Sequence, residues 1–145
     1  MSQRLVASAL APEGYKALFA CGPYLLKAVP QPLLDIIWLR VSQINGCAYC
    51  VDRHGRDALK HGADLTKVLH TAIWWESPLF DAKERAVLAW TEAVTRLEHQ
   101  RVPDDVFETL REHYGDKEIA DLTIAIAAMN AWNRIGVSTR MTPKE

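Results

Sequence analysis

The sequence has little of several features that would define a class of function. Its 145 residues carry a formal net charge of −1 and only three cysteines. A net charge so close to zero gives no electrostatic reason to expect nucleic acid or an anionic membrane as a partner. The longest apolar stretch, residues 122–132, is interrupted by Thr123 and Asn130 and is too short to span a bilayer. We therefore expect neither a nucleic-acid nor a membrane partner.

A secretory signal is also missing from the pattern. The apolar patch that follows Arg4 is broken early by Glu13 and Lys16, which is too soon for a signal peptide. Three cysteines without an export signal do not suggest a disulfide scaffold. They favour a reducing, cytoplasmic location, where a C-x-x-C pair is more often catalytic or metal-binding than structural.

The composition that is present is that of one globular domain, residues 1–145, with 49% apolar and 24% charged residues. Apolar residues recur at helical spacing between proline, glycine and capping residues. No stretch convincingly predicts a strand, and no internal repeat appears. The sequence predicts an all-α fold, a compact bundle of about six or seven helices. The main expected helices are 12–21, 32–44, 47–61, 65–75, 82–98, 104–113 and 117–135.

The most informative stretch is residues 45–54, which holds Cys47, Cys50 and His54. Spacings of three and four place these side chains on one face of a helix. Asn45-Gly46 supplies the turn and cap, so both thiols should lie in the first turn. There the helix dipole lowers a cysteine pKa. His54 stands one turn beyond Cys50 but roughly 10.5 Å of axial rise beyond Cys47, so it can exchange a proton directly with Cys50 alone. The pattern indicates a dithiol–histidine redox site.

Other interpretations of the same motif are weaker. A c-type haem attachment needs histidine directly after the second cysteine, where Val51 stands. A thioredoxin-like site would follow a strand. Structural zinc needs four ligands, and Cys21, His61 and His70 lack the spacing of a second pair. We therefore expect no metal and no cofactor. A pair of inert, buried cysteines remains an open alternative.

Asp35 is the second candidate site residue. It lies in the expected helix 32–44 among apolar residues that leave almost no polar face, so this helix should be buried nearly all round. A carboxylate in that position must be paired, hydrogen-bonded or functional. Its early place in the helix, where the dipole favours an acid, is the alternative. Cys21 is interpreted as a packing residue, and His61 as a C-terminal cap of the cysteine helix.

Residues 39–54 resemble the AhpD-like alkyl hydroperoxidase core of the carboxymuconolactone decarboxylase superfamily. Looser similarity covers nearly the whole chain. The resemblance implies an all-helical fold, assembly as trimers or hexamers, and thiol-based reduction of hydroperoxides. The decarboxylase branch is not favoured, because its chemistry has no use for a C-x-x-C pair.

The resemblance also implies individual roles. Cys50 matches the cysteine that attacks the peroxide, and Cys47 matches the partner that closes a disulfide. His54 matches the relay histidine. Asp35 stands where the family has a glutamate, twelve residues before the first cysteine; it is one methylene shorter and would reach His54 through a water. Tyr49 replaces a histidine of AhpD proper, which places the chain with a smaller AhpD-like group.

The leading hypothesis is thus a thiol peroxidase in which Asp35 orients His54 and His54 deprotonates Cys50. A lipoyl-type or thioredoxin-like dithiol would then reduce the disulfide, at the sulfur expected to be more exposed, that of Cys47. An organic hydroperoxide could bind among aromatic residues, for which the candidates are Trp38, Tyr49, Trp74 and Trp75. The alternatives are a dithiol redox sensor or disulfide carrier with little peroxidase turnover, and a helical scaffold with inert thiols.

Overall fold

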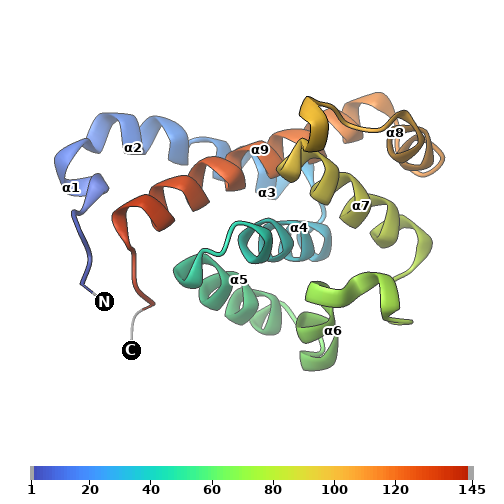
Figure 1. Ribbon diagram of the computed structural model, residues 1–145, viewed down its shortest axis with the longest axis horizontal. Coiled ribbons are helices and arrows are strands. Elements are labelled where there is room, and N and C mark those ends of the chain that lie inside the picture. The colour runs from blue at the N-terminus through green and yellow to red at the C-terminus, as the bar shows by residue number, and fades with distance from the viewer. Residues whose placement is uncertain (1, 144–145) are drawn as a thin grey trace.

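The computed structural model describes residues 2–143, and over that range the chain forms helices joined by turns, with no strand (Figure 1). The all-α fold class predicted from the sequence is confirmed. The elements are α1 (Ala7–Leu10), α2 (Pro12–Phe19), α3 (Cys21–Ala28), α4 (Gln31–Ile44), α5 (Ala48–Lys60), α6 (Leu65–His70), the 3₁₀ helix η1 (Thr71–Glu76), α7 (Ala82–Arg96), the 3₁₀ helix η2 (Glu98–Gln100), α8 (Asp104–Arg111) and α9 (Asp116–Thr139). Within the described range, none of these helices has the length and apolar character needed to cross a membrane.

Helix starts follow the capping residues of the sequence. Asp81 and Glu84 form a capping box at α7, and the side chain of Asp64 accepts a hydrogen bond from the backbone of Thr66 at the start of α6. The expected helix 65–75 is only half correct. The α-helix ends at His70, and the chain continues as 3₁₀ turns with Ile73 at a non-helical φ of −133°.

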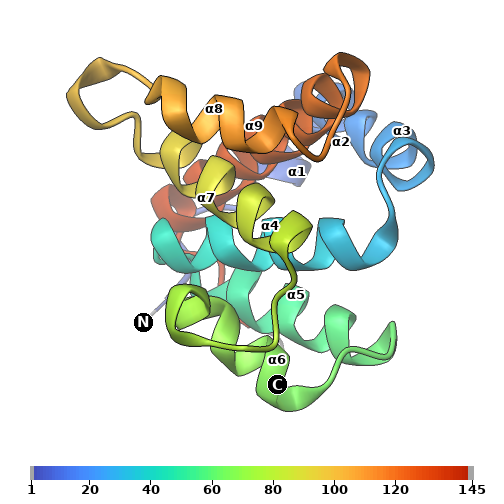
Figure 2. The ribbon, with the colours of Figure 1, turned by 90° about the vertical axis from the view of Figure 1, so that its right-hand side faces the viewer.

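Helix α4 is the central element, and it packs against α5, α7 and α9 (Figures 1 and 2). Leu34, Ile37 and Val41 expose no measurable surface. Burying each such side chain contributes about 1.5–3 kcal/mol. The prediction that this helix is buried nearly all round is therefore confirmed.

A buried ion pair fastens η1 to the central helices. Arg40, 6% exposed, lies 2.7 Å from a Glu92 carboxylate oxygen and donates to the backbone carbonyl of Ala72 at 3.2 Å. Trp74 donates its indole N–H to the same carboxylate at 2.8 Å. Each charged group in this cluster is hydrogen-bonded. The cluster therefore has a structural role, which is to hold η1 against α4 and α7.

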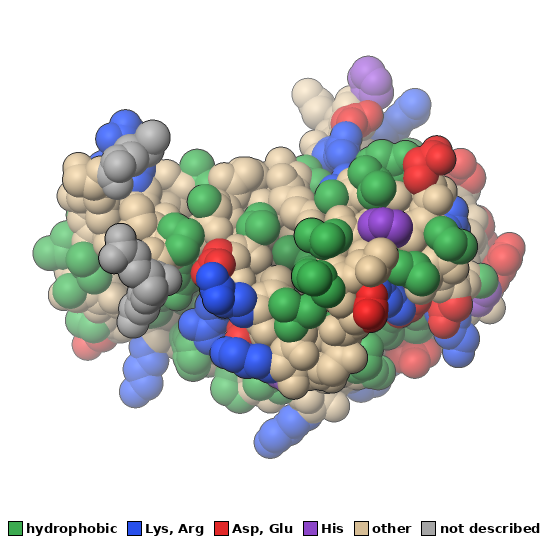
Figure 3. Space-filling model, turned by 90° about the horizontal axis from the view of Figure 1, so that it is seen from below, with side chains coloured by type: hydrophobic (Ala, Val, Ile, Leu, Met, Phe, Trp, Pro, Cys, Tyr) green, Lys and Arg blue, Asp and Glu red, His purple; other side chains and the backbone are tan. Residues whose placement is uncertain are grey.

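The surface is not uniformly polar. Seen from below, the molecule displays hydrophobic side chains between its charged ones (Figure 3). Five large exposed apolar residues belong to the segment from α6 to the start of α7: Leu65, Leu69, Ile73, Trp75 and Leu79. Each of these five side chains is more than 40% exposed.

Candidate active site

The two motif cysteines lie at the N-terminus of α5 and are joined as a disulfide, with their Cα atoms 5.3 Å apart. The turn before them uses Gly46 at φ +66°, a conformation that favours glycine. Cys47 is itself the N-cap, and its sulfur accepts a 3.3 Å hydrogen bond from the backbone N–H of Cys50. The position of the C-x-x-C at a helix N-terminus is as predicted. The capping role expected of Asn45-Gly46 falls instead to Cys47.

Asn45 instead connects the turn before α5 to α9 through hydrogen bonds. Its side-chain amide donates to Asn130 and to Asn133, both at 3.0 Å. Asn133 exposes no surface and donates in turn to the hydroxyl of Ser42 on α4 at 3.1 Å. This network fixes the start of the cysteine helix against both neighbouring helices.

The backbone of α9 covers the disulfide at Gly136. A Cβ atom at this position would lie 2.9 Å from the sulfur of Cys47 and 3.5 Å from that of Cys50. Glycine is needed here because the helix backbone and the sulfurs are in direct contact. Both cysteines are consequently buried, at 2% exposure for Cys47 and 5% for Cys50.

His54 lies one turn after Cys50 on the same helix, with its ring 5.4 Å from that of Trp38 on α4. Burial is the main cause that lowers the pKa of His54 to about 4; the charge of Arg53 lowers it further and that of Asp57 opposes the shift. The imidazole is therefore neutral near pH 7 in the disulfide form. A neutral imidazole can accept a thiol proton.

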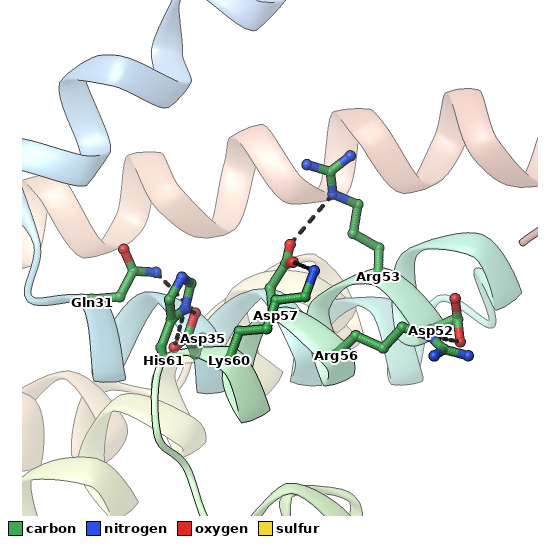
Figure 4. Close-up of polar contacts among 8 residues, drawn as sticks. All are labelled: Gln31, Asp35, Asp52, Arg53, Arg56, Asp57, Lys60 and His61. Carbon is green, nitrogen blue, oxygen red and sulfur yellow. Dashed lines mark hydrogen bonds and ion pairs between the residues drawn. The ribbon is translucent and has the colours of Figure 1, made fainter. Parts of the chain in front are cut away.

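Asp35 does not contact His54 as the sequence-based hypothesis required. Its two carboxylate oxygens lie 3.1 and 3.0 Å from Nδ1 of His61, and one of them accepts from Gln31 at 2.9 Å (Figure 4). Within residues 2–143 these are its side-chain partners. Asp35 is 5% exposed, so the prediction of a buried, paired carboxylate was right, although the proposed partner was wrong. His61 is both the C-cap of α5 and the partner of this acid.

The reason is the antiparallel register of α4 and α5. Trp38 lies beside His54, whereas Asp35, three residues back along α4, reaches His61, which is seven residues further along α5 than His54. Seven residues are about two helical turns, so Asp35 meets the far end of α5. It lines a separate cavity of about 250 Å³, together with His61, Lys67 and Glu84.

Cys50 and His54 line a larger cavity of about 390 Å³. Its walls are mainly aromatic and aliphatic, from α2, α3, α4 and α9: Tyr15, Phe19, Leu25, Trp38, Met129 and Trp132. Tyr15 and Phe19 pack edge-on against Trp132, with ring centroids 4.7 and 6.4 Å away. Such a concave apolar site with a few polar groups is the usual form of a small-molecule pocket.

The cavity agrees with the predicted aromatic pocket in part. Trp38 and Tyr49 line it, whereas Trp74 and Trp75 belong to the cluster around Arg40 and do not. The unpaired Cys21 also lines it, beyond its expected role in packing.

Access to the two sulfurs differs from the expectation. Cys50 lines the cavity and Cys47 does not, so the sulfur that faces it belongs to Cys50 and not to Cys47. Arg53 lines the cavity too, and its position three residues after Cys50 is the sequence signal that could have placed it there. Tyr15, Phe19, Trp132 and Gly136 had no such signal, because distant helices bring them in. Over residues 2–143, no three His, Cys, Asp or Glu side chains are grouped as a metal site.

The fold and the site define an all-helical protein with a disulfide-bonded cysteine pair at a helix N-terminus. The family model for the carboxymuconolactone decarboxylase family matches residues 12–93, more than half of the chain. The chain belongs to this family, as an AhpD-like member.

Two similar proteins match nearly the whole length of the chain. The chain is similar to the uncharacterized protein YdfG of Bacillus subtilis, with 35% identity and 95% of each chain covered. It is also similar to the crystal structure of a protein of unknown function from Agrobacterium tumefaciens, described as a candidate AhpD antioxidant defence protein. That match has 39% identity, a TM-score of 0.96 and 99% coverage of each chain.

The same fold carries other chemistry. The debrominase Bmp8 superposes with a TM-score of 0.84, covering 94% of this chain and 73% of Bmp8, at 20% identity. At that identity the likeness shows the fold alone, and a shared fold does not specify a reaction.

Proposed function

We propose that this chain is a thiol-dependent hydroperoxide reductase that uses Cys50, Cys47 and His54. The observation that carries the proposal is the disulfide at the N-terminus of α5, of which Cys50, together with His54, faces an apolar cavity. A cysteine that alternates between thiol and disulfide beside a neutral imidazole has the groups that peroxide reduction requires.

In the reduced protein, His54 takes the proton of Cys50, and the helix N-terminus stabilises the thiolate. The thiolate attacks the terminal oxygen of ROOH, the O–O bond breaks, and the alkoxide leaves as ROH after it takes up a proton. Cys50 becomes a sulfenic acid. The thiol of Cys47 then attacks this sulfur and expels water, which forms the disulfide seen in the structure.

A dithiol must return the two electrons. Because Cys50 faces the cavity, we propose that the reductant attacks that sulfur and forms a mixed disulfide with it. Cys47 is then the leaving thiolate, stabilised by its hydrogen bond from the Cys50 backbone N–H. The second thiol of the reductant releases Cys50. Two deeply buried cysteines favour a slim lipoyl-type dithiol over a thioredoxin-like protein surface.

Asp35 acts indirectly in this scheme. Its contacts with His61 and Gln31 join the start of α4 to the end of α5, and so hold the helix pair that carries His54 and Trp38. We assign it a positioning role, not proton transfer.

We also propose that the protein assembles with copies of itself, as a trimer or hexamer. Family resemblance supports this assembly, and so do the large apolar side chains exposed between α6 and α7.

The test is consumption of cumene hydroperoxide with dihydrolipoamide as the reductant. Turnover should be lost in Cys50→Ser and in Cys47→Ser and retained in Cys21→Ser. When peroxide is added without the dithiol, the Cys47→Ser variant should accumulate a sulfenic acid at Cys50, which dimedone traps and mass spectrometry detects. A protein whose dithiol cycles without consuming peroxide would be a disulfide carrier and would contradict the proposal.

A further inference from the structure

Four of the polar residues that line the 390 Å³ cavity, including its charged one, lie on one element. Its walls from α2, α3, α4 and α9 are mainly apolar, whereas Tyr49, Cys50, Arg53 and His54 all come from α5. A ligand that fills this cavity therefore has one polar end and one apolar body.

The polar end meets a single full charge, and that charge is positive. Among the described lining residues, Arg53 is the permanent cation, no carboxylate is present, and His54 is neutral because burial keeps its pKa at about 4. Arg53 is 60% exposed at its side chain, which places it at the mouth of the cavity and not in its floor.

The neighbouring carboxylates leave N–H groups of the Arg53 guanidinium free to bind a ligand. Asp57 lies 3.4 Å from its Nε and also pairs with Lys60 at 3.7 Å, while Asp52 pairs with Arg56 at 2.8 Å. The two terminal nitrogens of Arg53 point away from Asp57, towards α9 in the view of Figure 4. Two parallel N–H donors are the arrangement that binds a carboxylate in bidentate form.

Tyr49 adds a second donor at the same place. Tyr49 lies four residues before Arg53 on α5 and lines the same cavity, so its hydroxyl can donate to a ligand bound at the same end. Both residues line the cavity within one helical turn of Cys50.

We propose that the cavity selects organic molecules with a carboxylate, which Arg53 and Tyr49 bind at its mouth while an apolar body lies against Trp38 and Trp132. Combined with the proposed peroxidase activity, on which this part rests, the substrate class is a hydroperoxide that carries a carboxylate. The carboxylate site itself does not depend on peroxide chemistry.

The test measures binding without turnover. Octanoate and octanamide have nearly the same shape and differ in charge, and their binding is followed by quenching of tryptophan fluorescence in the oxidised protein. The wild type should bind octanoate roughly 10-fold more tightly than octanamide, a factor worth ~1.4 kcal/mol. Arg53→Met should remove this preference, because octanoate binding weakens by much more than octanamide binding. Arg56→Met, the matched control on the same helix, lies outside the cavity lining and should keep the preference.

Equal binding of the two probes to the wild type, or no saturable binding of either, would overturn the proposal. An equal loss in Arg53→Met and Arg56→Met would do so too, because it would show a general surface-charge effect. The outcome is separate from the peroxidase assay. Carboxylate selection without peroxide consumption refutes the proposed function alone, and peroxide consumption without carboxylate selection refutes only the site proposed here.

Discussion

The buried state of His54 makes a quantitative prediction about stability and pH. Its pKa is about 4 in the folded, oxidised protein and about 6.5 when the chain is unfolded. Between these values the unfolded state binds more protons than the folded state, so stability rises with pH and is lost as the pH falls through this window. Integration of the two titrations gives a loss of about 2 kcal/mol between about pH 7 and about pH 5.

The assay is urea denaturation of the oxidised protein at both pH values, for the wild type and for His54→Gln. Glutamine is neutral at both, so the wild-type free energy of unfolding should fall by about 2 kcal/mol more than that of the variant. Carboxylates and the other histidines titrate alike in both proteins and cancel in this difference. If the two proteins lose the same stability, the pKa of His54 is not lowered by burial in the folded protein, and this reasoning is refuted.

Three further predictions concern other parts of the molecule. Asp35→Asn should change the free energy of unfolding by about 1 kcal/mol and leave the rate of Cys50 alkylation within a factor of ~2, because the acid contacts His61; a ~10²–10⁴-fold fall would instead indicate proton transfer through Asp35. Gly136→Ala should destabilise the oxidised protein by about 1–3 kcal/mol, since its methyl group would lie 2.9 Å from the Cys47 sulfur, and thermal melting that matches the wild type would refute this contact. Light scattering should show a trimer or hexamer, and replacing Leu69 and Trp75 by lysine should shift the mass towards the monomer; an unaltered mass would move the interface elsewhere.

The features that could be predicted from the sequence are those that depend on residues within one or two helical turns of each other. Two such predictions were correct: the helical spacing of Cys47, Cys50 and His54, and the burial of α4. Both follow from the periodicity of a single helix. For Asp35, the local sequence predicted the burial but not the hydrogen-bond partner. Its burial followed from its apolar neighbours, but its partner depends on how two helices align across a turn. A strict antiparallel alignment of residues 31–44 and 48–60 would have placed Trp38 beside His54, but it pairs Asp35 with Asp57; the actual partner, His61, lies four residues further along.

The walls of the cavity could not be predicted in this way. Tyr15 and Phe19 come from α2, and Trp132 comes from α9, more than a hundred residues later. No spacing in the sequence relates these residues to Cys50, since only the packing of the N-terminal helices against α9 brings them together. Gly136 is similar, because the need for glycine arises from a contact between two helices.

The burial of the disulfide has a consequence for steady-state kinetics. Gly136 packs against both sulfurs, and Cys50 is the motif cysteine that lines the cavity. In the proposed cycle, the oxidising and the reducing substrate would therefore enter by the same route and exclude one another. The enzyme should show parallel double-reciprocal plots, and an excess of either substrate should inhibit competitively against the other. The supply of reductant would thus set an upper limit on the peroxide concentration at which the protein works best.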